Sequence, residues 1–436
     1  MEDSPPKADL PPMAIDSRES EPAAPGLRHR LAVLSEPDFR RFFIGYTASL
    51  FGSSMAPVAV AFAVLDGGGS GTELGWVMAA RILPIVLVLL VGGVFADRLG
   101  SRSVMLMSEL LRGGVQAVFA VALMCGRPPL WVLVVLVTVW GVGEGFFLPA
   151  QGALVPDLVR QKQLLSEANA LLGLARSVTT VAGPAVAGIV TATLGPATVL
   201  LVDAATYAVG AAALARLSLP PRAADAEAGS LLADLRQGWS AFRSLTWLWV
   251  TTLQMGLFNL LVWAPFLVLG PLTAQQRLGG ARAWGLIMAV YGAGALLAGT
   301  AMLGRRPRRP LVVATVAALG WALPSASLAA DAPLPLTVLA ALFAGAGSAV
   351  CGTLYATATQ QHVPPDVLAR VTSFGALGAF ALGPLGLAAA GPIADRLGTS
   401  AVLAAGALWQ LGAVAATVAV PAVRALGSAV PARRGG

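Results

Sequence analysis

The sequence predicts an all-α integral membrane protein with twelve transmembrane helices, arranged as two pseudo-symmetric six-helix bundles around a central cavity. Three observations predict it. The 436 residues are 56% hydrophobic and only 12% charged, and their mean hydropathy is +0.75, a composition that water-soluble domains do not have. The chain also divides at Gly, Pro and Arg residues into twelve apolar segments, and its two halves share short sequence matches.

Each apolar segment is long enough to cross a bilayer, because a hydrocarbon core of about 30 Å takes about 20 helical residues. In the first half the segments are 41–65, 74–96, 104–125, 130–154, 166–194 and 197–215. In the second half they are 245–270, 283–303, 310–330, 334–361, 367–394 and 400–423. They lack the two-residue alternation of strands and exceed strand length, so helices are expected.

The remaining residues complete a division into five parts. These are a disordered cytoplasmic tail (1–38), a first bundle (39–217), a cytoplasmic linker (218–242), a second bundle (243–424) and a second cytoplasmic tail (425–436). The first tail is rich in proline and in charges of both signs, a composition typical of disorder. It lacks the apolar centre of a cleaved signal.

The positions of Lys and Arg predict the orientation. With a cytoplasmic N-terminus, 22 of the 29 basic residues lie in inward segments and four in outward loops. This asymmetry predicts that both termini are cytoplasmic. The net charge of +7 then indicates attraction to anionic membrane lipids rather than to nucleic acid. The Ala-, Gly- and Arg-rich composition suggests a bacterium with GC-rich DNA, and hence its inner membrane.

Short matches between the halves indicate an internal repeat. Residues 147–156 align with 355–364 at an offset of 208, and residues 188–195 align with 391–398. Each match is weak alone, but they occur in the same order at equivalent places. They predict parallel repeats with a binding site near the midplane, where the repeats meet.

A charged turn bracketed by glycines follows the second segment. It reads Gly93-Val-Phe-Ala-Asp97-Arg98-Leu-Gly100-Ser-Arg102, and it resembles the signature loop of major facilitator superfamily transporters. Gly93 would let the second span approach a neighbour closely, and Asp97 would face the positive end of another helix. The resemblance implies a gate in which Asp97 meets the start of the eleventh span, at 364–366, and Arg102 meets Asp157.

Other segments are similar to bacterial exporters of macrolides and siderophores within that superfamily. They are 82–84, 92–98, 110–112, 168–171, 183–184 and 203–207. The helix-packing motif formed by Gly183, Pro184 and Gly188 resembles the exporter signature GPxxGG, with Ala187 in place of its first paired glycine. The resemblance implies proton-coupled export, by a monomer, of an amphipathic antibiotic, siderophore or other secondary metabolite.

An importer of the same fold and a membrane sensor that does not transport remain alternatives. An integral-membrane enzyme is the least supported, because the two histidines and two cysteines form no metal or nucleophile motif. No phosphate-binding GxxxxGK[ST] loop is present in the sequence. No metal or other cofactor is therefore expected.

Six acidic or basic residues lie in the interiors of the predicted spans, all in the first half, and their charges sum to zero: Arg81, Glu109, Arg112, Glu144, Arg176 and Asp203. Placing such a group in a span costs at least about 2.5 to 3.5 kcal/mol. Depth along the helices predicts a structural pair between Arg81 and Asp203. It places Glu144 level with Arg112 and Arg176, and Glu109 shares a helix face with Arg112.

Four of these residues are candidates for proton coupling: Glu144, Glu109, Arg112 and Arg176. Glu144 is favoured because Gly141, Gly143 and Gly145 flank it and leave its carboxyl room to exchange an Arg partner for a proton. An equally supported interpretation makes Glu144 a permanently ionised partner of Arg112 or Arg176.

In this superfamily the first, fourth, seventh and tenth spans line the substrate cavity. The candidates there are Tyr46, Ser53, Met55, Trp140, Phe147, Gln254, Phe258, Asn259, Trp263 and Tyr355. Aromatic rings, hydroxyls and amides suit a largely apolar organic molecule with a few hydrogen-bonding groups. Ordinary helix packing also explains any single member. The sequence leaves open the substrate, the proton stoichiometry and the direction of transport.

Overall fold

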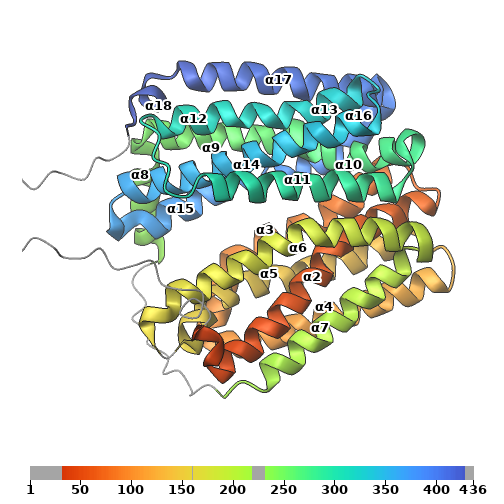
Figure 1. Ribbon diagram of the computed structural model, residues 1–436, viewed down its shortest axis with the longest axis horizontal. Helices are drawn as coiled ribbons and strands as arrows, with labels where there is room; N and C mark the ends of the chain where they lie inside the picture. Colours follow the sequence, from red (N-terminus) through yellow and green to blue (C-terminus); the bar gives the residue numbers. More distant parts are fainter. Residues whose placement is uncertain (1–31, 160, 219–230, 428–436) are drawn as a thin grey trace, which may run out of the picture.

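The computed structural model describes residues 32–159, 161–218 and 231–427, without the side chains of 32, 89–98, 162, 231–235, 365–366 and 369. The described part consists of helices and short connections, with no strand (Figure 1). Twelve helical segments in it are long and apolar enough to cross a membrane. The predicted fold class and number of spans are confirmed. The predicted tails lie largely outside the described residues.

The first half contains six continuous spans. They are α2 (Pro37–Asp66), α3 (Gly71–Leu99), α4 (Ser101–Met124), α5 (Leu130–Leu158), α6 (Leu165–Leu194) and α7 (Pro196–Ala215), with short 3-10 turns η1 (Ala32–Ser35) and η2 (Lys162–Leu164). Pro37 and Pro196 occupy first-turn positions, where a missing N–H costs nothing. Gly100 and Gly195, with φ of 82° and 84°, separate successive helices in a backbone conformation that glycine tolerates best.

Three of the six spans in the second half are interrupted. The seventh contains α9 (Thr246–Phe258), η3 (Asn259–Trp263), α10 (Ala264–Thr273) and η4 (Ala274–Leu278); the eighth is α11 (Ala281–Ala301). The ninth contains α12 (Pro310–Ala317), η5 (Ala318–Trp321) and α13 (Ala322–Ala329), and the tenth is α14 (Leu334–His362). The eleventh contains α15 (Pro365–Phe380) and α16 (Gly383–Leu397). The twelfth is α17 (Thr399–Ala419), which the short helix α18 (Pro421–Ala425) follows.

The interruption in the seventh span has a local cause. Its π-helical turn η3 is followed by Pro265, which has no N–H to donate to the preceding turn. The amide of Asn259 donates to the carbonyl oxygens of Met255 and of Ala379, each at 3.1 Å, so it links the interrupted span to the end of α15. Such π turns often mark functional places in a helix.

The two halves meet at one end of the molecule and diverge towards the other (Figure 1). We call the end where α2 begins and α17 ends the terminal end, and the opposite end the distal end. Between the halves, α6 packs on α11 and α3 packs on α16. One apolar core at the distal end includes residues of both halves. At the terminal end the apolar clusters belong to one half each. The structure is therefore closed at its distal end and separated at its terminal end.

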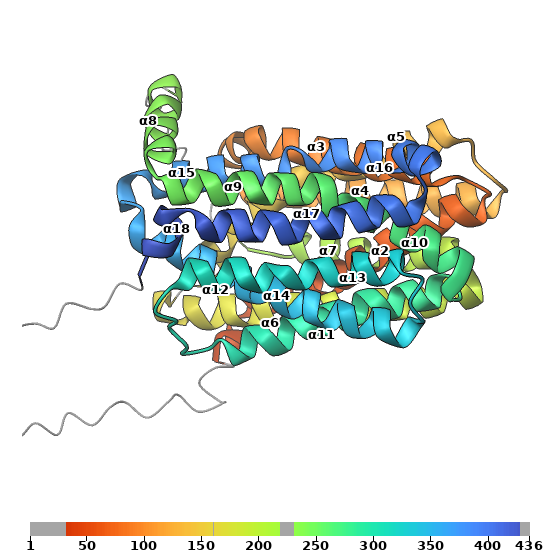
Figure 2. The ribbon, with the colours of Figure 1, turned by 90° about the horizontal axis from the view of Figure 1, so that it is seen from above.

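The second part of the linker between the halves is a helix, α8 (Leu231–Ser244). It stands across the direction of the spans (Figure 2) and packs on α15. The rings of Trp239 and Phe242 lie 5.6 and 6.3 Å from the ring of Phe374, and Arg370 donates to the Gln237 side chain at 2.6 Å. The linker thus returns the chain to the terminal end of the eleventh span.

Candidate functional site

Charged side chains form a buried cluster inside the first half, between α2, α4 and α7. Glu109 is 1% exposed, Arg112 3% and Asp203 0%. The Arg112 guanidinium lies 3.2 Å from the Glu109 carboxylate, which also accepts a hydrogen bond from Ser49 at 2.9 Å. The predicted sharing of one helix face by Glu109 and Arg112 is confirmed.

Asp203 supplies a second carboxylate to this cluster. Its Oδ2 accepts a hydrogen bond from Gln116 at 2.9 Å, whereas its Oδ1 is buried with no hydrogen-bond partner. The Arg112 guanidinium also lies over the rings of Phe147, at 4.2 Å, and Tyr207, at 4.5 Å. Because an unpaired charge in this environment is very unfavourable, the two carboxylates and the guanidinium depend on one another.

A second ion pair lies nearer the surface of the first half. Arg81 of α3 and Glu144 of α5 are 2.7 Å apart, and their side chains are 19% and 26% exposed. The Arg81 guanidinium lies 4.0 Å from the centre of the Trp140 ring. Trp140 in turn donates to the Tyr207 hydroxyl at 2.9 Å. A chain of contacts therefore runs from Glu144 to Arg81, then to Trp140 and Tyr207, and finally to Arg112.

Two pairings predicted from depth are wrong. Arg81 pairs with Glu144 and not with Asp203, and neither Arg112 nor Arg176 forms the direct ion pair expected with Glu144. Arg176 instead donates to the Tyr46 hydroxyl at 3.1 Å. Depth along separate helices gives neither their tilt nor the direction of each side chain, and both decide which groups meet.

The glycines around Glu144 explain its actual partner. A Cβ on Gly141 would collide with the backbone of Arg81, and one on Gly145 would lie 2.8 Å from Val88. These glycines therefore bring α3 against α5 and place Arg81 beside Glu144. Gly143 faces the stem of Arg112, where a Cβ would lie 2.7 Å from Cγ. The glycines therefore allow close helix packing, and they do not leave the carboxyl group the free space that the sequence analysis expected.

The residues of the predicted gate are described only in part. Gly93, Asp97 and Arg98 lie within 89–98 and Asp366 within 365–366, whose side chains are outside the described residues. Gly100 has a φ of 82°. Arg102 donates to the carbonyl oxygens of Leu214 and Ala215 at 2.9 and 2.7 Å, which places a cation at the negative end of α7. Asp157 lies exposed at the end of α5, and its contact with Arg102 stays a prediction.

The second half encloses a cavity of about 350 Å³ near the terminal end. Residues of α9, α12, η5, α14 and α15 line it, together with Gln410 of α17. None of the lining residues is an Asp, Glu, Lys, Arg or His, so the lining is uncharged at neutral pH. The ring of Phe258 stacks on that of Trp321 with 4.0 Å between centres. Thr252 and Tyr355 share a hydrogen bond of 3.2 Å. The lining is thus aromatic and apolar, with a few hydroxyls and amides.

The cavity includes part of the predicted substrate site. Gln254, Phe258 and Tyr355 line it. The Asn259 amide donates to a carbonyl oxygen in the turn before the π turn. The ring of Trp263 lies beside that of Tyr291 in a tilted arrangement, with 5.4 Å between centres. In the first half Tyr46, Met55, Trp140 and Phe147 are buried in the bundle, and Ser53 donates to Tyr207 at 2.9 Å. Trp321, on the ninth span, is a lining residue that the sequence analysis did not select.

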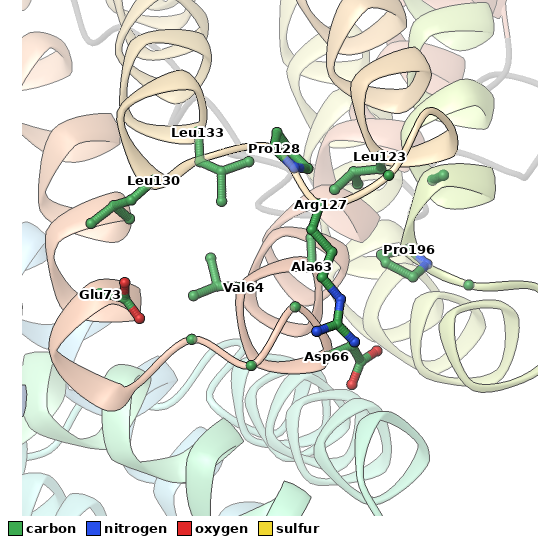
Figure 3. A pocket seen from close by; sticks show the side chains of 16 residues that line it. Ala63, Val64, Asp66, Glu73, Leu123, Arg127, Pro128, Leu130, Leu133 and Pro196 are labelled. Atoms are coloured by element: carbon green, nitrogen blue, oxygen red, sulfur yellow. The ribbon is translucent and has the colours of Figure 1, made fainter.

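A separate hollow of about 380 Å³ lies at the distal end of the first half (Figure 3). The turns that follow α2, α4 and α6 surround it, with Asp66, Glu73 and Arg127 among its lining residues. Asp66 accepts from Gln275 of the second half at 3.1 Å, and Glu73 completes a capping box with Ser70. Both acids thus have structural partners. Within the described residues no cluster of three or more metal-ligand side chains occurs.

The family model of the Major Facilitator Superfamily matches residues 42–387. The chain belongs to this superfamily. Its twelve apolar helices and its family together make it a multi-pass membrane transporter.

Curated relatives within the superfamily cover most of the chain. It is 29% identical over 394 residues to the "Multidrug efflux pump Tap" of Mycolicibacterium fortuitum, an alignment covering 86% of this chain and 93% of Tap. It is 22% identical over 369 residues to "Macrolide efflux protein A" of Streptococcus pyogenes, covering 83% and 90% of the two chains.

Solved structures share the superfamily fold. The nucleoside transporter NupG aligns with a TM-score of 0.69 at 13% identity, over 88% of this chain and 98% of NupG. A bacterial homolog of the human lysosomal transporter Spinster, in an inward-facing and occupied conformation, aligns with a TM-score of 0.64 at 13% identity, over 90% and 97% of the chains. At these identities the likeness concerns the fold alone.

The motif that resembles the exporter signature lies at contacts of α6. A Cβ on Gly183, next to Pro184, would collide with Ser54 of α2. A Cβ on Gly188 would lie 2.6 Å from the carbonyl oxygen of Ala281 and 3.0 Å from the Cα of Gly285, both on α11. Gly188 therefore lets the backbones of α6 and α11 approach each other where the two halves meet.

We expect Gly188→Ala to separate α6 from α11, because the carbonyl and the Cα that it would meet are backbone atoms that cannot turn aside. The apparent melting temperature in detergent should fall by several degrees, as about 1 to 3 kcal/mol of overpacking implies. Gly173→Ala on the same helix is the matched control, since a Cβ there meets nothing within 4 Å. Equal melting temperatures for both variants would contradict this role of Gly188.

Proposed function

We propose that the chain exports small amphipathic organic molecules, such as antibiotics or siderophores, across a bacterial inner membrane in exchange for protons. The observation that carries this proposal is the division of the molecule. The buried charged residues Glu109, Arg112 and Asp203, and the ion pair of Arg81 with Glu144, belong to the first half. The cavity of the second half instead has an uncharged lining. Both curated relatives are named as efflux proteins, which supports export over import.

The proposed orientation puts the terminal end in the cytoplasm. The basic segment from Arg305 to Arg309, between α11 and α12, lies at this end together with Arg102 and Arg243, as the excess of Lys and Arg on cytoplasmic loops requires. The structure is then the inward-open form, whose cavity faces the cytoplasm. The outward-open form requires the terminal end to close at the gate formed by Gly93, Asp97, Arg98, Gly100, Arg102 and Asp157.

The cavity sets the class of substrate. A volume of about 350 Å³ lies within the range of small-molecule sites. Stacked Phe258 and Trp321 offer flat apolar surface, and the side chains of Thr252, Gln254 and Tyr355 offer hydrogen bonds. The uncharged lining disfavours phosphates and small ions, and its few polar groups disfavour sugars.

Glu144 is the proposed proton carrier. It is the most exposed carboxylate among the ion pairs inside the spans, at 26% against 1% for Glu109, so the protein encloses it least. When Glu144 takes up a proton, Arg81 loses its partner, and the contacts through Trp140 and Tyr207 convey this change to Arg112. One proton moving down 100 mV supplies about 2.3 kcal/mol, enough for a roughly fiftyfold substrate gradient per charge.

We expect Glu144→Gln to abolish the dependence of transport on a pH gradient, because a neutral amide cannot exchange a proton. The measurement is accumulation of a panel of macrolides and siderophores in everted vesicles, with and without an imposed gradient. Substrate exchange without a gradient should continue. Glu73→Gln is the matched control, because Gln also completes a capping box and this residue lies outside the ion-pair network.

Gradient-driven accumulation by Glu144→Gln would exclude Glu144 as the carrier while leaving export intact. A wild-type protein that binds substrates but accumulates none would contradict transport itself and favour a sensor. Accumulation in right-side-out vesicles alone would favour an importer.

We expect Trp321→Ala to weaken binding of aromatic substrates by about tenfold, since a stacked aromatic pair contributes about 0.5 to 1.5 kcal/mol beyond its buried area. Equilibrium binding to the purified protein measures this loss. Trp131→Ala is the control, because Trp131 lies on the outer surface of α5 with 67% exposure. Equal binding by the two variants would remove the cavity as the substrate site.

A further inference from the structure

The end of α16 repeats the signature found at the end of α3. Residues 391–398 read GPIADRLG and residues 93–100 read GVFADRLG, with the same residue at six of the eight positions. The two copies lie at opposite ends of the molecule. The first copy ends α3 at the terminal end, and the second ends α16 at the distal end, beside the beginning of α3.

The second copy makes direct contact between the two halves. Asp395 accepts a hydrogen bond from the Thr72 hydroxyl at 2.7 Å. A Cβ on Gly391 would collide with the backbone of Thr72, and a Cβ on Gly75 would collide with the carbonyl of Leu387. Glycines on opposite helices thus allow α3 and α16 to touch backbone to backbone.

The partner of Asp395 is the first turn of α3. Ser70 and Glu73 cap this turn reciprocally, and the partial positive charge of a helix N-terminus favours a nearby carboxylate. Asp395 itself is exposed, so water can replace its contact when the distal end opens. Aspartate against a helix start, with glycine at the crossing, is the arrangement expected of the first copy at the terminal end.

We propose that Gly391 and Asp395 form a distal latch that holds the inward-open state, as the counterpart of the gate at the terminal end. The span built from α15 and α16 runs antiparallel to α3, so each of the two spans ends in one copy of the signature. The start of α3 lies beside the second copy, and the start of α15 would meet the first copy when the terminal end closes. Closing either end would thus bring an aspartate against the start of a helix, with a glycine at the crossing, on the same pair of spans. The sidedness of this latch rests on the proposed orientation.

Two thiols report the state of each end independently of any substrate. In a Cys125→Ser background, Cys351 lines the cavity of the second half and is half-buried, so a membrane-impermeant maleimide applied to inside-out vesicles measures opening of the terminal end. In a Cys125→Ser, Cys351→Ser background, Val268→Cys measures opening of the distal end in right-side-out vesicles. Val268 is 0% exposed and packs near Gly75.

Asp395→Asn should raise the labelling rate at position 268 and lower it at Cys351, by about two- to fivefold, the size expected for a charge at a helix end. Gly391→Ala should shift both rates in the same direction by more, because its Cβ meets backbone. Asp97→Asn should shift both rates in the opposite direction. Gly383→Ala on α16 meets nothing within 4 Å and should change neither rate.

The distal latch is overturned if Asp395→Asn and Gly391→Ala, eluting as folded protein, leave both rates unchanged. It is equally overturned if Asp395→Asn and Asp97→Asn shift the rates in the same direction. Because labelling needs neither substrate nor gradient, a failure of drug accumulation with reciprocal labelling intact would contradict the proposed function alone.

Discussion

The buried guanidinium of Arg112 is the group on which the interior of the first half depends. It forms an ion pair with Glu109, and its positive charge also interacts with the Asp203 carboxylate. Its flat face lies over the rings of Phe147 and Tyr207. In hydrocarbon, only protein groups satisfy such a charge. The cluster consequently holds helices α2, α4 and α7 in one arrangement. Gly210 leaves room for the Glu109 carboxylate, because a Cβ at this position would lie 2.9 Å from it. Loss of the guanidinium would leave two carboxylates without a counter-charge.

The second half is built differently. Its spans are interrupted at η3, at η5 and between α15 and α16, and the cavity lies among these interrupted helices. Bends there involve Asn259 and the prolines rather than ion pairs. A half fixed by charge pairs thus faces a half whose helices bend around an uncharged cavity. Under the proposed function, this asymmetry would divide the binding of protons and of organic molecules between two pseudo-symmetric bundles.

The sequence predicted the features that depend on nearby residues. Hydropathy and length predicted twelve spans, and the three-residue spacing of Glu109 and Arg112 predicted that they share a helix face. Partners on different helices were predicted wrongly for Arg81, because the rotation of each helix depends on which small residues meet. Gly141, close to Glu144 on the same span, was the one sequence signal for the true pairing. A glycine near an acid lets a neighbouring span come close enough for an ion pair, and here Gly141 packs against the backbone of Arg81. The cavity around Trp321 could not be predicted, because it follows from the break at η5.

Helix α3 connects the ion pair with Glu144 to both ends of the molecule. Arg81, at its middle, belongs to the ion pair with Glu144; Thr72 and Gly75, at its distal end, touch α16; the signature from Gly93 to Arg102 follows at its terminal end. The described ion pairs lie within one half, such as Arg112 with Glu109 and Arg277 with Asp331. The contacts between halves at α3 are apolar packing around Leu74 and Val77, glycine packing and one exposed hydrogen bond, without an ion pair among the described residues. Under the proposed mechanism, opening of the distal end would break this packing and this hydrogen bond, and one proton moving down 100 mV would supply roughly 2.3 kcal/mol towards that change.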